Sequence, residues 1–418
     1  MTVSRDIYVP GDKSLSHRAL IFSALATGKS RVRGILRSQD IESTASVLRR
    51  LGVEVPPLAD EIEISGRGLR GMRAPAADLD CGNSGTTARL MAGVVAGHPF
   101  VSRFVGDGSL SRRPMRRIVE PLTAMGAHCT LEAGDGLPMR IDGGQLHAIE
   151  WKSEIASAQV KGAVLLAALV GRVPVTYTEP VLSRDHTENI LEALGAAIET
   201  TGTRLSLYPS SSLLPLDLHV PADPSSAAYF VALSVAHPDL EIVLPNVCLN
   251  FTRIGFILAL RSMGAPISFE DPREEGGEPI GTIIARPGAL KAIEIGGSVV
   301  PTMIDEIPLL ACLATRATGE TVIRGAEELR VKETDRIAAV AANLTALGAT
   351  VTEMKDGLRV AGTSSPLVGR VRSFGDHRIA MAFGVLGALP GNRIEIDDPS
   401  CVDISYPMFW ADLRRAAS

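Results

Sequence analysis

One pattern recurs six times along this 418-residue chain: a short polar cluster runs into an apolar, alanine-rich stretch that ends in a small turn. The polar clusters are GDKSLSHR, CGNSGTTA, SEIASAQVK, DPSS, MIDE and GDHR, and the stretches after them are ALIFSALATG, RLMAGVVAG, GAVLLAALVG, AAYFVALSVA, IPLLACLAT and IAMAFGVLGAL. The turns recur at roughly 70-residue intervals, near Gly28, Gly97, Gly171, His237, Gly319 and Gly391. Self-similarity at a fixed period indicates a repeated structural unit, so the chain is restricted to folds built from six copies of one motif.

Each copy places polar residues at the start of an apolar helix. The first backbone N–H groups of a helix have no partner within the helix and carry a partial positive charge. A helix start of this kind is suited to binding an anion. We therefore predict that the function lies at the repeated helix starts and involves a negatively charged ligand.

The second half of each repeat is a more amphipathic helix that ends in Leu-Gly or Met-Gly. Five copies read RRLGVEV, TAMGAHC, EALGAAIE, RSMGAPIS and TALGATVT, and SYPMFWADLRRAA would be the sixth helix. The glycine fits the position after a helix, where a positive φ is needed. Strand-like runs follow each first helix in SRVRG, PFVSRFVG, VPVTYTE, EIVLP, ETVIRG and RIEIDD, with shorter ones such as EIEISGRG and GLRVAG. This alternation predicts an α/β protein.

Length and composition further narrow the class of protein that this chain can be. A chain of 418 residues exceeds what one hydrophobic core usually serves, so we expect two domains. Its hydrophobic residues make up 45% and its aromatic residues only 4%, so Ala, Val, Leu and Ile must build the core. A net charge of −5 argues against a nucleic-acid-binding protein and favours a local cationic site for a small anion.

The cysteines and the chain start favour a cytoplasmic protein. Five cysteines are dispersed along the chain without metal-ligand spacing, which is typical of reduced thiols. The start MTVSRDIYVP does not read as a signal peptide. The longest apolar runs span about ten to fourteen residues, which is too short to cross a bilayer, so no membrane association is expected.

The first polar cluster gathers basic residues at a helix start. Lys13 would lie at the mouth of the helix and Arg18 about one turn in, with Ser14 and His17 between them. Asp12 or Ser14 would cap the helix. Two cations beside unpaired N–H groups predict an anion site, and a capped helix with solvated basic residues is the alternative interpretation.

The second cluster, CGNSGTTA at 81–88, resembles a small phosphate-binding loop. Gly82 and Gly85 would allow close approach of the backbone, and the two threonines that follow offer hydroxyl groups. No lysine follows as in a Walker loop, and an ordinary helix start is the alternative. Cys81 is expected to be a small buried residue rather than a nucleophile. Downstream, Arg113 precedes a proline that fits the first position of a helix, while the neighbouring arginines are expected at the surface.

Acidic and basic residues come together in the last two repeats. On a helix, Lys332 and Arg336 of the segment KETDR would lie one turn apart on one face, as in an ordinary solvated pair. Asp305 and Glu306 would begin the fifth repeat's helix, where carboxylates among cations are candidates for proton transfer. The segment DHR at 376–378 adds a histidine, more often structural than catalytic, and an arginine at another helix start.

The free energy needed to bind an anion requires several of these clusters to act together. One helix start contributes about 0.3–1 kcal/mol to holding an anion, whereas micromolar binding needs roughly 8 kcal/mol. Charge-assisted hydrogen bonds of about 1.5–3 kcal/mol each supply the difference only if several arginines and lysines converge.

Six segments, in order, resemble those of the 5-enolpyruvylshikimate-3-phosphate (EPSP) synthase family: PGDKSLSHRA, GNSGTTARL, ASAQVKGAVLLAAL, DPSSAAYF, LRVKETDRI and GDHRIAMAF. The resemblance covers essentially the whole chain. It implies two similar domains, each made of three βαβαββ-type repeats around buried parallel helices, as in an inside-out α/β barrel. The chain crossings would fall near Pro10 and Val220. The first domain would then be residues 11–220 and the second domain residues 1–10 and 221–418, with the active site in the cleft between them.

The resemblance also implies a reaction, in which the enolpyruvyl group of phosphoenolpyruvate is transferred to the 5-hydroxyl of shikimate 3-phosphate. The residues implied to bind shikimate 3-phosphate are Lys13, Ser14, Arg18, Ser157, Ala158, Gln159, Arg184, Asp305 and Lys332. Those implied to surround phosphoenolpyruvate are Lys13, Asn83, Gly85, Thr86, Arg113, Gln159, Arg336, His377 and Arg378. No metal or organic cofactor is implied, and we expect a cytoplasmic monomer of the class that glyphosate targets.

The chemistry needs an acid–base pair that works in both directions. The 5-hydroxyl adds to C2 of phosphoenolpyruvate while C3 gains a proton, and phosphate then leaves the tetrahedral intermediate as C3 loses a proton. We hypothesise that Asp305 is the base towards the hydroxyl and that Glu333 exchanges the C3 proton. Lys13 would be the electrostatic partner or acid.

This chain departs from the family pattern in places. Ile404 stands where many members carry a lysine shortly before the final Phe/Tyr-Pro pair, so one cation near the leaving phosphate is missing or supplied elsewhere. Ala158 replaces a serine found in many members. Gly85 leaves room beside the phosphoenolpyruvate site, where some glyphosate-tolerant members have alanine.

Two other functions compete with this interpretation. The related enolpyruvyl transferase acting on UDP-N-acetylglucosamine would show Lys-Asn in place of Lys13-Ser14 and a reactive cysteine in a glycine-rich loop, which neither Cys81 nor Cys129 resembles. A non-catalytic anion-binding repeat protein would keep the arginines and glycines but would not need Asp305 and Glu333 beside them.

Overall fold

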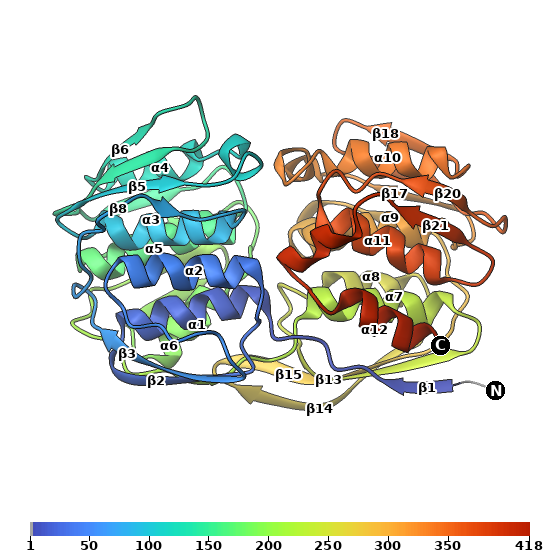
Figure 1. The fold of residues 1–418 in the computed structure, drawn as a ribbon, viewed down its shortest axis with the longest axis horizontal. Helices are drawn as coiled ribbons and strands as arrows, with labels where there is room; N and C mark the ends of the chain where they lie inside the picture. Colours follow the sequence, from blue (N-terminus) through green and yellow to red (C-terminus); the bar gives the residue numbers. More distant parts are fainter. Residues whose placement is uncertain (1–2) are drawn as a thin grey trace. The chain divides into compact units, whose positions relative to one another are not determined.

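The computed structural model describes residues 3–418 and divides into two compact units (Figure 1). The first unit comprises Gly11–Val220 together with Glu275–Glu278. The second unit comprises the chain up to Pro10, then Pro221–Glu274 and Pro279–Ser418. The four-residue insertion into the first unit is the turn that joins strands β14 (Ile267–Glu275) and β15 (Glu278–Ala285), and no sequence pattern predicted it.

The first unit contains three helix–strand–helix–strand repeats. The elements of the first repeat are α1 (Lys13–Leu25), β2 (Thr27–Arg33), α2 (Gln39–Arg50) and β3 (Glu61–Arg67). Those of the second are β4 (Leu79–Asp80), α3 (Gly85–Ala96), β5 (Val101–Val105), α4 (Arg116–Ala124), β6 (His128–Leu131) and β7 (Met139–Asp142). The third comprises β8 (Ile149–Lys152), α5 (Ala158–Gly171), β9 (Val175–Thr178), α6 (His186–Ala193), β10 (Ile198–Thr201) and β11 (Arg204–Leu207), and β12 (Asp217–His219) ends the unit.

The second unit repeats the plan with a shorter last copy. It opens with β1 (Val3–Asp6) and continues with α7 (Pro224–Ala236), β13 (Leu240–Cys248), α8 (Gly255–Ser262), β14 and β15. The next repeat comprises β16 (Glu294–Ile295), η2 (Gly297–Glu306), α9 (Ile307–Ala314), β17 (Glu320–Ile323), η3 (Glu327–Val331), α10 (Arg336–Ala346), β18 (Val351–Met354) and β19 (Gly357–Ala361). The last comprises β20 (Val368–Val371), α11 (His377–Ala388), β21 (Arg393–Ile396), η4 (Pro399–Ile404) and α12 (Phe409–Ala417).

The strand order of the β-sheets repeats in the same way as the helices. Four of them share one strand order: β4-β5-β7-β6, β8-β9-β11-β10, β16-β17-β19-β18 and β1-β13-β15-β14. In the first three of these, the first pair of strands is parallel and the later pairs are antiparallel. The sheets β12-β2-β3 and β20-β21 are shortened versions. The six-copy pattern of the sequence is thus a repeat of supersecondary structure, and the predicted α/β class is confirmed.

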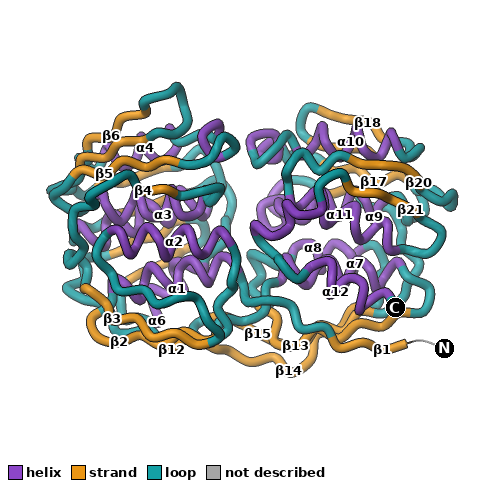
Figure 2. Tube along the Cα trace, in the orientation of Figure 1, coloured by secondary structure: helices purple, strands orange, loops and turns teal. Residues whose placement is uncertain are grey.

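The first helix of each repeat forms the core of its unit. Helices α1, α3, α5, α7, α9 and α11 are buried over almost their whole surface, because beyond their polar starts they are largely apolar on every side. Helix α3 packs closely on α5 in the first unit, and α11 packs on α7 and α9 in the second. Figure 2 shows these helices lying between the strands of each unit.

Local signals in the sequence set the ends of these helices. The glycine after each of the five second helices has a positive φ, as predicted, at Gly52, Gly126, Gly195, Gly264 and Gly348. Five of the six core helices start at a side-chain cap, provided by Asp12, Ser84, Ser157, Asp223 and Asp376. Helix α9 is the exception, since it continues directly from η2.

One stretch, Gly297–Ala314, is long and apolar enough to cross a membrane by length and composition alone. It is longer than the apolar runs expected from the sequence because η2 and α9 follow each other without a break. The backbone at Met303 is not helical, and Pro301 lies inside η2. Every residue of α9 is buried in the core of the second unit.

Candidate active site

The predicted site residues fall into two groups, one in each unit. In the first unit most of them lie at or near the starts of α1, α3 and α5 or on the loop before α6, and Arg113 directly follows the short helix η1 (Leu110–Arg112). In the second unit they lie at the junction of η2 with α9 and at the starts of α10 and α11. The helix starts that the sequence indicated therefore carry the candidate residues in both units.

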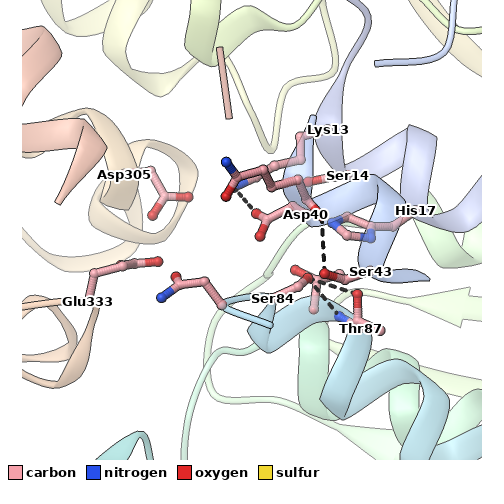
Figure 3. A network of polar contacts seen from close by, with 12 residues as sticks. Lys13, Ser14, His17, Asp40, Ser43, Ser84, Thr87, Asp305 and Glu333 are labelled. Carbon is pink, nitrogen blue, oxygen red and sulfur yellow. Dashed lines mark hydrogen bonds and ion pairs between the residues drawn. The ribbon is translucent and has the colours of Figure 1, made fainter. Parts of the chain in front are cut away.

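At the start of α1, residues on other elements of the first unit hold the predicted lysine and arginine in place. Lys13 Nζ lies 3.0 Å from Asp40 Oδ2 at the start of α2, a contact drawn as a dashed line in Figure 3. Arg18 is buried; its Nε donates to Thr187 Oγ1 at 2.8 Å and its Nη1 donates to the carbonyl oxygen of Ser14 at 3.0 Å. These contacts hold both cations in place at one helix start.

The loop before α6 adds a further cation at this point. Arg184 Nη1 lies 3.4 Å from Ser14 Oγ, within the hydrogen-bond limit but long. Arg18 and Arg184 thus both contact Ser14, one at its carbonyl and one at its hydroxyl. Two guanidinium groups at the N-terminus of a buried helix suit a phosphate group.

The starts of α3 and α5 are joined by a chain of side-chain hydrogen bonds. Arg89 Nη1 donates to Gln159 Oε1 at 2.6 Å, and Gln159 Nε2 donates to Thr86 Oγ1 at 2.9 Å. The bond from Arg89 fixes which end of the Gln159 amide is the donor. Nearby, Arg113 Nη2 donates to Asn83 Oδ1 at 2.7 Å. Arg89 was not predicted from the sequence.

Gly85 is the first residue of α3 and lies against two of these arginines. A Cβ atom built on Gly85 would be 2.8 Å from Arg89 Nη1 and 3.3 Å from Arg113 Nη1. The absence of a side chain therefore allows both guanidinium groups to approach the start of the helix. The predicted role of Gly85, to leave room beside phosphoenolpyruvate, stays a prediction.

His17 links α1 to α2 and α3 rather than facing a ligand. It is fully buried, and its Nδ1 lies 2.7 Å from Thr44 Oγ1, which in turn lies 2.7 Å from Thr87 Oγ1. Thr87 Oγ1 donates to Ser84 Oγ at 2.8 Å, as Figure 3 shows. Burial and the nearby cations hold the pKa of His17 well below its usual value, so the ring is neutral near neutral pH.

In the second unit, one buried arginine contacts three carboxylates. Arg336 Nε donates to Asp376 Oδ2 at 2.8 Å, its Nη2 donates to Glu333 Oε2 at 2.7 Å, and its Nη1 lies 3.2 Å from Asp305 Oδ1. Lys332 Nζ lies 3.4 Å from the same Asp305 oxygen. Burial alone would lower the pKa of Arg336, but the three carboxylates outweigh it and raise the pKa above its usual value.

A second buried arginine lies at the start of α11. Arg378 Nη1 lies 3.4 Å from Glu306 Oε1, and Tyr229 interacts with the same guanidinium group. Burial raises the pKa of Tyr229 to about 12, against the opposing effect of Arg378. His377 is buried beside it at the first position of the helix.

Two local predictions were wrong. Lys332 and Glu333 precede α10 instead of lying on it, because Asp335 caps the helix by accepting a hydrogen bond from Ala338 N at 3.0 Å. The proline after Arg113 is not the first residue of a helix either, since α4 starts only at Arg116.

Neither Cys81 nor Cys129 is an activated thiol, as predicted. Cys81 is fully buried, which raises the pKa of its thiol, and its environment is that of a small core residue. Cys129 lies on β6, and burial raises its pKa to about 11. A thiol activated for nucleophilic attack would show the opposite shift.

Three further residues belong to the site and were missed as site residues from the sequence. Asp40 pairs with Lys13, Arg89 orients Gln159, and Asp376 both caps α11 and holds Arg336. Arg89 did leave a signal, since a lone arginine within an Ala/Leu-rich helix must be buried with a partner.

Comparison with solved structures defines the class. The chain superposes on EPSP synthase from Acinetobacter baumannii with a TM-score of 0.87 and 40% sequence identity, covering 99% of this chain and 96% of that one. An enolpyruvyl transferase from Streptomyces tendae shares the fold, with a TM-score of 0.76 at 19% identity over 99% of this chain and 95% of that chain. The fold is that of the enolpyruvyl transferases.

Sequence comparison narrows this class to one family. The profile of EPSP synthase (3-phosphoshikimate 1-carboxyvinyltransferase) matches residues 1–413. The 3-phosphoshikimate 1-carboxyvinyltransferase of Chloroflexus aurantiacus is 48% identical over 413 residues, covering 97% of this chain and 95% of the relative. That of Bacillus cereus is 45% identical over 413 residues, covering 99% and 96%. The chain therefore belongs to the EPSP synthase family.

Proposed function

We propose that this protein transfers the enolpyruvyl group of phosphoenolpyruvate to the 5-hydroxyl of shikimate 3-phosphate, releasing phosphate, in the shikimate pathway of aromatic amino acid biosynthesis. The observation that carries the proposal is the gathering of cationic and hydroxyl side chains at three helix starts of the first unit, within a chain of this family. Two anionic substrates need such a surplus of donors.

The first unit would bind most of the substrate charge. We assign the 3-phosphate group of shikimate 3-phosphate to Ser14, Arg18 and Arg184, because both arginines contact that serine. Ser157, Ala158 and Gln159 at the start of α5 would hold the rest of that substrate. Asn83, Gly85, Thr86 and Arg113 would hold phosphoenolpyruvate, with Lys13 and Gln159 contacting both molecules.

The second unit would supply proton transfer. Its candidate cluster contains three cations and four carboxylates, so the carboxylates already outnumber the cations by one without a ligand: Lys332, Arg336, Arg378, Asp305, Glu306, Glu333 and Asp376. We infer that Arg336 and Arg378 hold phosphoenolpyruvate by exchanging carboxylate partners for the substrate. A carboxylate released in this way is available as a base.

Two of these carboxylates suit the two proton transfers. Asp305 would accept the proton of the 5-hydroxyl as it attacks C2 of phosphoenolpyruvate, with Lys332 holding the same hydroxyl. Glu333 would take up a proton once the substrate displaces it from Arg336, give that proton to C3, and take it back as phosphate leaves. The hydroxyl proton accepted by Asp305 would leave with the phosphate. Both steps use groups that Arg336 holds in fixed positions before the substrates bind.

The two groups of residues would act together on the same pair of substrates. We also propose that the enzyme works as a monomer in the cytoplasm and requires no metal or organic cofactor, in keeping with the dispersed, reduced cysteines.

Product analysis tests the reaction directly. Phosphorus NMR of the protein with both substrates should show loss of the phosphoenolpyruvate signal, a new shikimate-derived phosphomonoester signal, and one equivalent of inorganic phosphate. Arg113→Lys and Arg336→Lys should each raise the KM for phosphoenolpyruvate, because lysine cannot reproduce the planar fork of a guanidinium group. If only the first substitution had an effect, the second unit would not contribute to that site.

A further inference from the structure

The first unit contains a buried charge cluster that the reaction does not use directly. It consists of Lys161 on α5, Glu179 after β9 and Glu188 on α6, which we call the Lys161 cluster. Lys161 Nζ lies 2.6 Å from Glu188 Oε1 and 2.9 Å from Glu179 Oε1, and its side chain is only 3% exposed.

Such a cluster is a poor way to stabilise a core. Removing three charged groups from water is costly, and well-packed apolar residues of similar volume often serve as well or better. Burial raises the pKa of Glu188 even though Lys161 opposes the shift. For Lys161, burial lowers the pKa, but its two glutamates outweigh this effect and raise it overall. What the cluster does provide is directional contacts between three separate segments.

One of those contacts fixes the loop that carries Arg184. Glu179 accepts a hydrogen bond from Ser183 N at 2.9 Å through Oε1, and another from Ser183 Oγ at 2.6 Å through Oε2. Ser183 directly precedes Arg184, whose guanidinium group reaches Ser14. Lys161 therefore anchors, through Glu179, the residue next to a proposed phosphate contact.

A second contact fixes the start of α6. Glu188 accepts from Lys161, and its neighbour Thr187 accepts from Arg18 Nε at 2.8 Å. Consecutive residues of α6 thus hold Lys161 and Arg18. Lys161 itself lies two residues after Gln159, in the first turn of α5. The cluster joins α5, the loop before α6 and α6, and Thr187 links α6 to Arg18 on α1.

We propose that Lys161 is a positioning residue for the phosphate group of shikimate 3-phosphate: through Glu179 and Glu188 it holds Arg184 and Arg18 in register with the start of α5. This proposal rests on the function proposed above. A positioning role predicts weaker binding of shikimate 3-phosphate but not of shikimate, because only the phosphate group depends on these two arginines. A merely structural role predicts no such difference between the two compounds.

The test compares binding of shikimate 3-phosphate with binding of shikimate, which lacks the phosphate, by titration calorimetry. Two variants probe the cluster. Lys161→Met removes the central charge at similar length, and Ser183→Ala removes one buried hydroxyl while leaving all three charges in place. Ser234→Ala is the matched control, because that buried serine also donates hydrogen bonds, to carbonyls of Leu240 and Ala285, but lies in the second unit.

We expect Lys161→Met to weaken shikimate 3-phosphate at least tenfold and Ser183→Ala about threefold. In both variants the dissociation constant for shikimate and the KM for phosphoenolpyruvate should change less than twofold, and so should kcat. Ser234→Ala should lower the melting temperature without changing any of these values. If Lys161→Met does not fold, Ser183→Ala decides the matter.

Equal weakening of shikimate and shikimate 3-phosphate in the folded variants would overturn the positioning role, as would unchanged binding of both. A wild-type protein that binds neither compound would instead refute the proposed function, and the positioning role would fall with it.

Discussion

Replacing Gly85 with alanine tests how closely the arginines approach the start of α3. The new Cβ would lie 2.8 Å from Arg89 Nη1, closer than side-chain atoms of this kind approach one another, so the guanidinium group must move. That same nitrogen donates to Gln159 Oε1 at 2.6 Å. Moving it therefore breaks or stretches a charge-assisted hydrogen bond within the site.

The size of the effect follows from that bond. A hydrogen bond to a charged group contributes about 1.5–3 kcal/mol, and each 1.4 kcal/mol corresponds to about a tenfold change in binding. Gly85→Ala should therefore raise the KM for phosphoenolpyruvate by about 10- to 100-fold. Because alanine is preferred to glycine within a helix by roughly 0.5–1 kcal/mol, stability should not fall by a comparable amount.

Steady-state kinetics with both substrates, alongside thermal unfolding, would measure this effect. Gly144→Ala is the control, since a Cβ at Gly144 meets no atom within 4 Å. The effect should also shrink in a Gln159→Leu background, where the bond to Arg89 no longer exists. A KM for phosphoenolpyruvate within twofold of wild type would refute the reasoning, as would an equal loss in both backgrounds.

Three further variants test other parts of the account. Asp376→Asn should cost about 3–5 kcal/mol in urea unfolding, because it takes one carboxylate from the buried Arg336; a loss below about 1 kcal/mol would show that the remaining partners suffice. Glu333→Gln should abolish exchange of the phosphoenolpyruvate methylene hydrogens with solvent, measured by proton NMR in D2O, and retained exchange would remove Glu333 from that role. His17→Asn concerns acid stability. Because the folded pKa of His17 lies below the unfolded value of 6.5, the unfolded chain binds this proton first as the pH falls. The stability contributed by His17 is thus present above pH 6.5 and lost below it, at about 1.4 kcal/mol per pH unit. The variant should show a shallower loss of unfolding free energy between pH 6.5 and 5.5, and an identical slope would contradict the assignment.

Local features of this chain could be predicted because local physics determines them. The positive φ of Gly52 and its four counterparts follows from how a helix must end. The cap at Asp12 follows from the need to satisfy the first N–H groups of α1. The family resemblance, carried by six segments at helix starts, is confirmed by the family profile over residues 1–413.

Features that depend on distant parts of the chain, or on which of several polar residues caps a helix, could not be predicted. The pairing of Lys13 with Asp40 joins residues 27 positions apart, and that of Arg336 with Asp376 spans 40 positions. The spacing of KETDR fits a helix face, but the capping preference of Asp335 decides where α10 begins. In each case a tertiary or capping interaction outweighs the local pattern.

The acceptor dependence of phosphate release tests the central claim most directly. Release of inorganic phosphate from phosphoenolpyruvate should require shikimate 3-phosphate and should not occur with UDP-N-acetylglucosamine as the acceptor. Release with the nucleotide sugar alone would assign the protein to the related enolpyruvyl transferase reaction. Folded protein that releases phosphate with neither acceptor would contradict the proposed catalysis altogether.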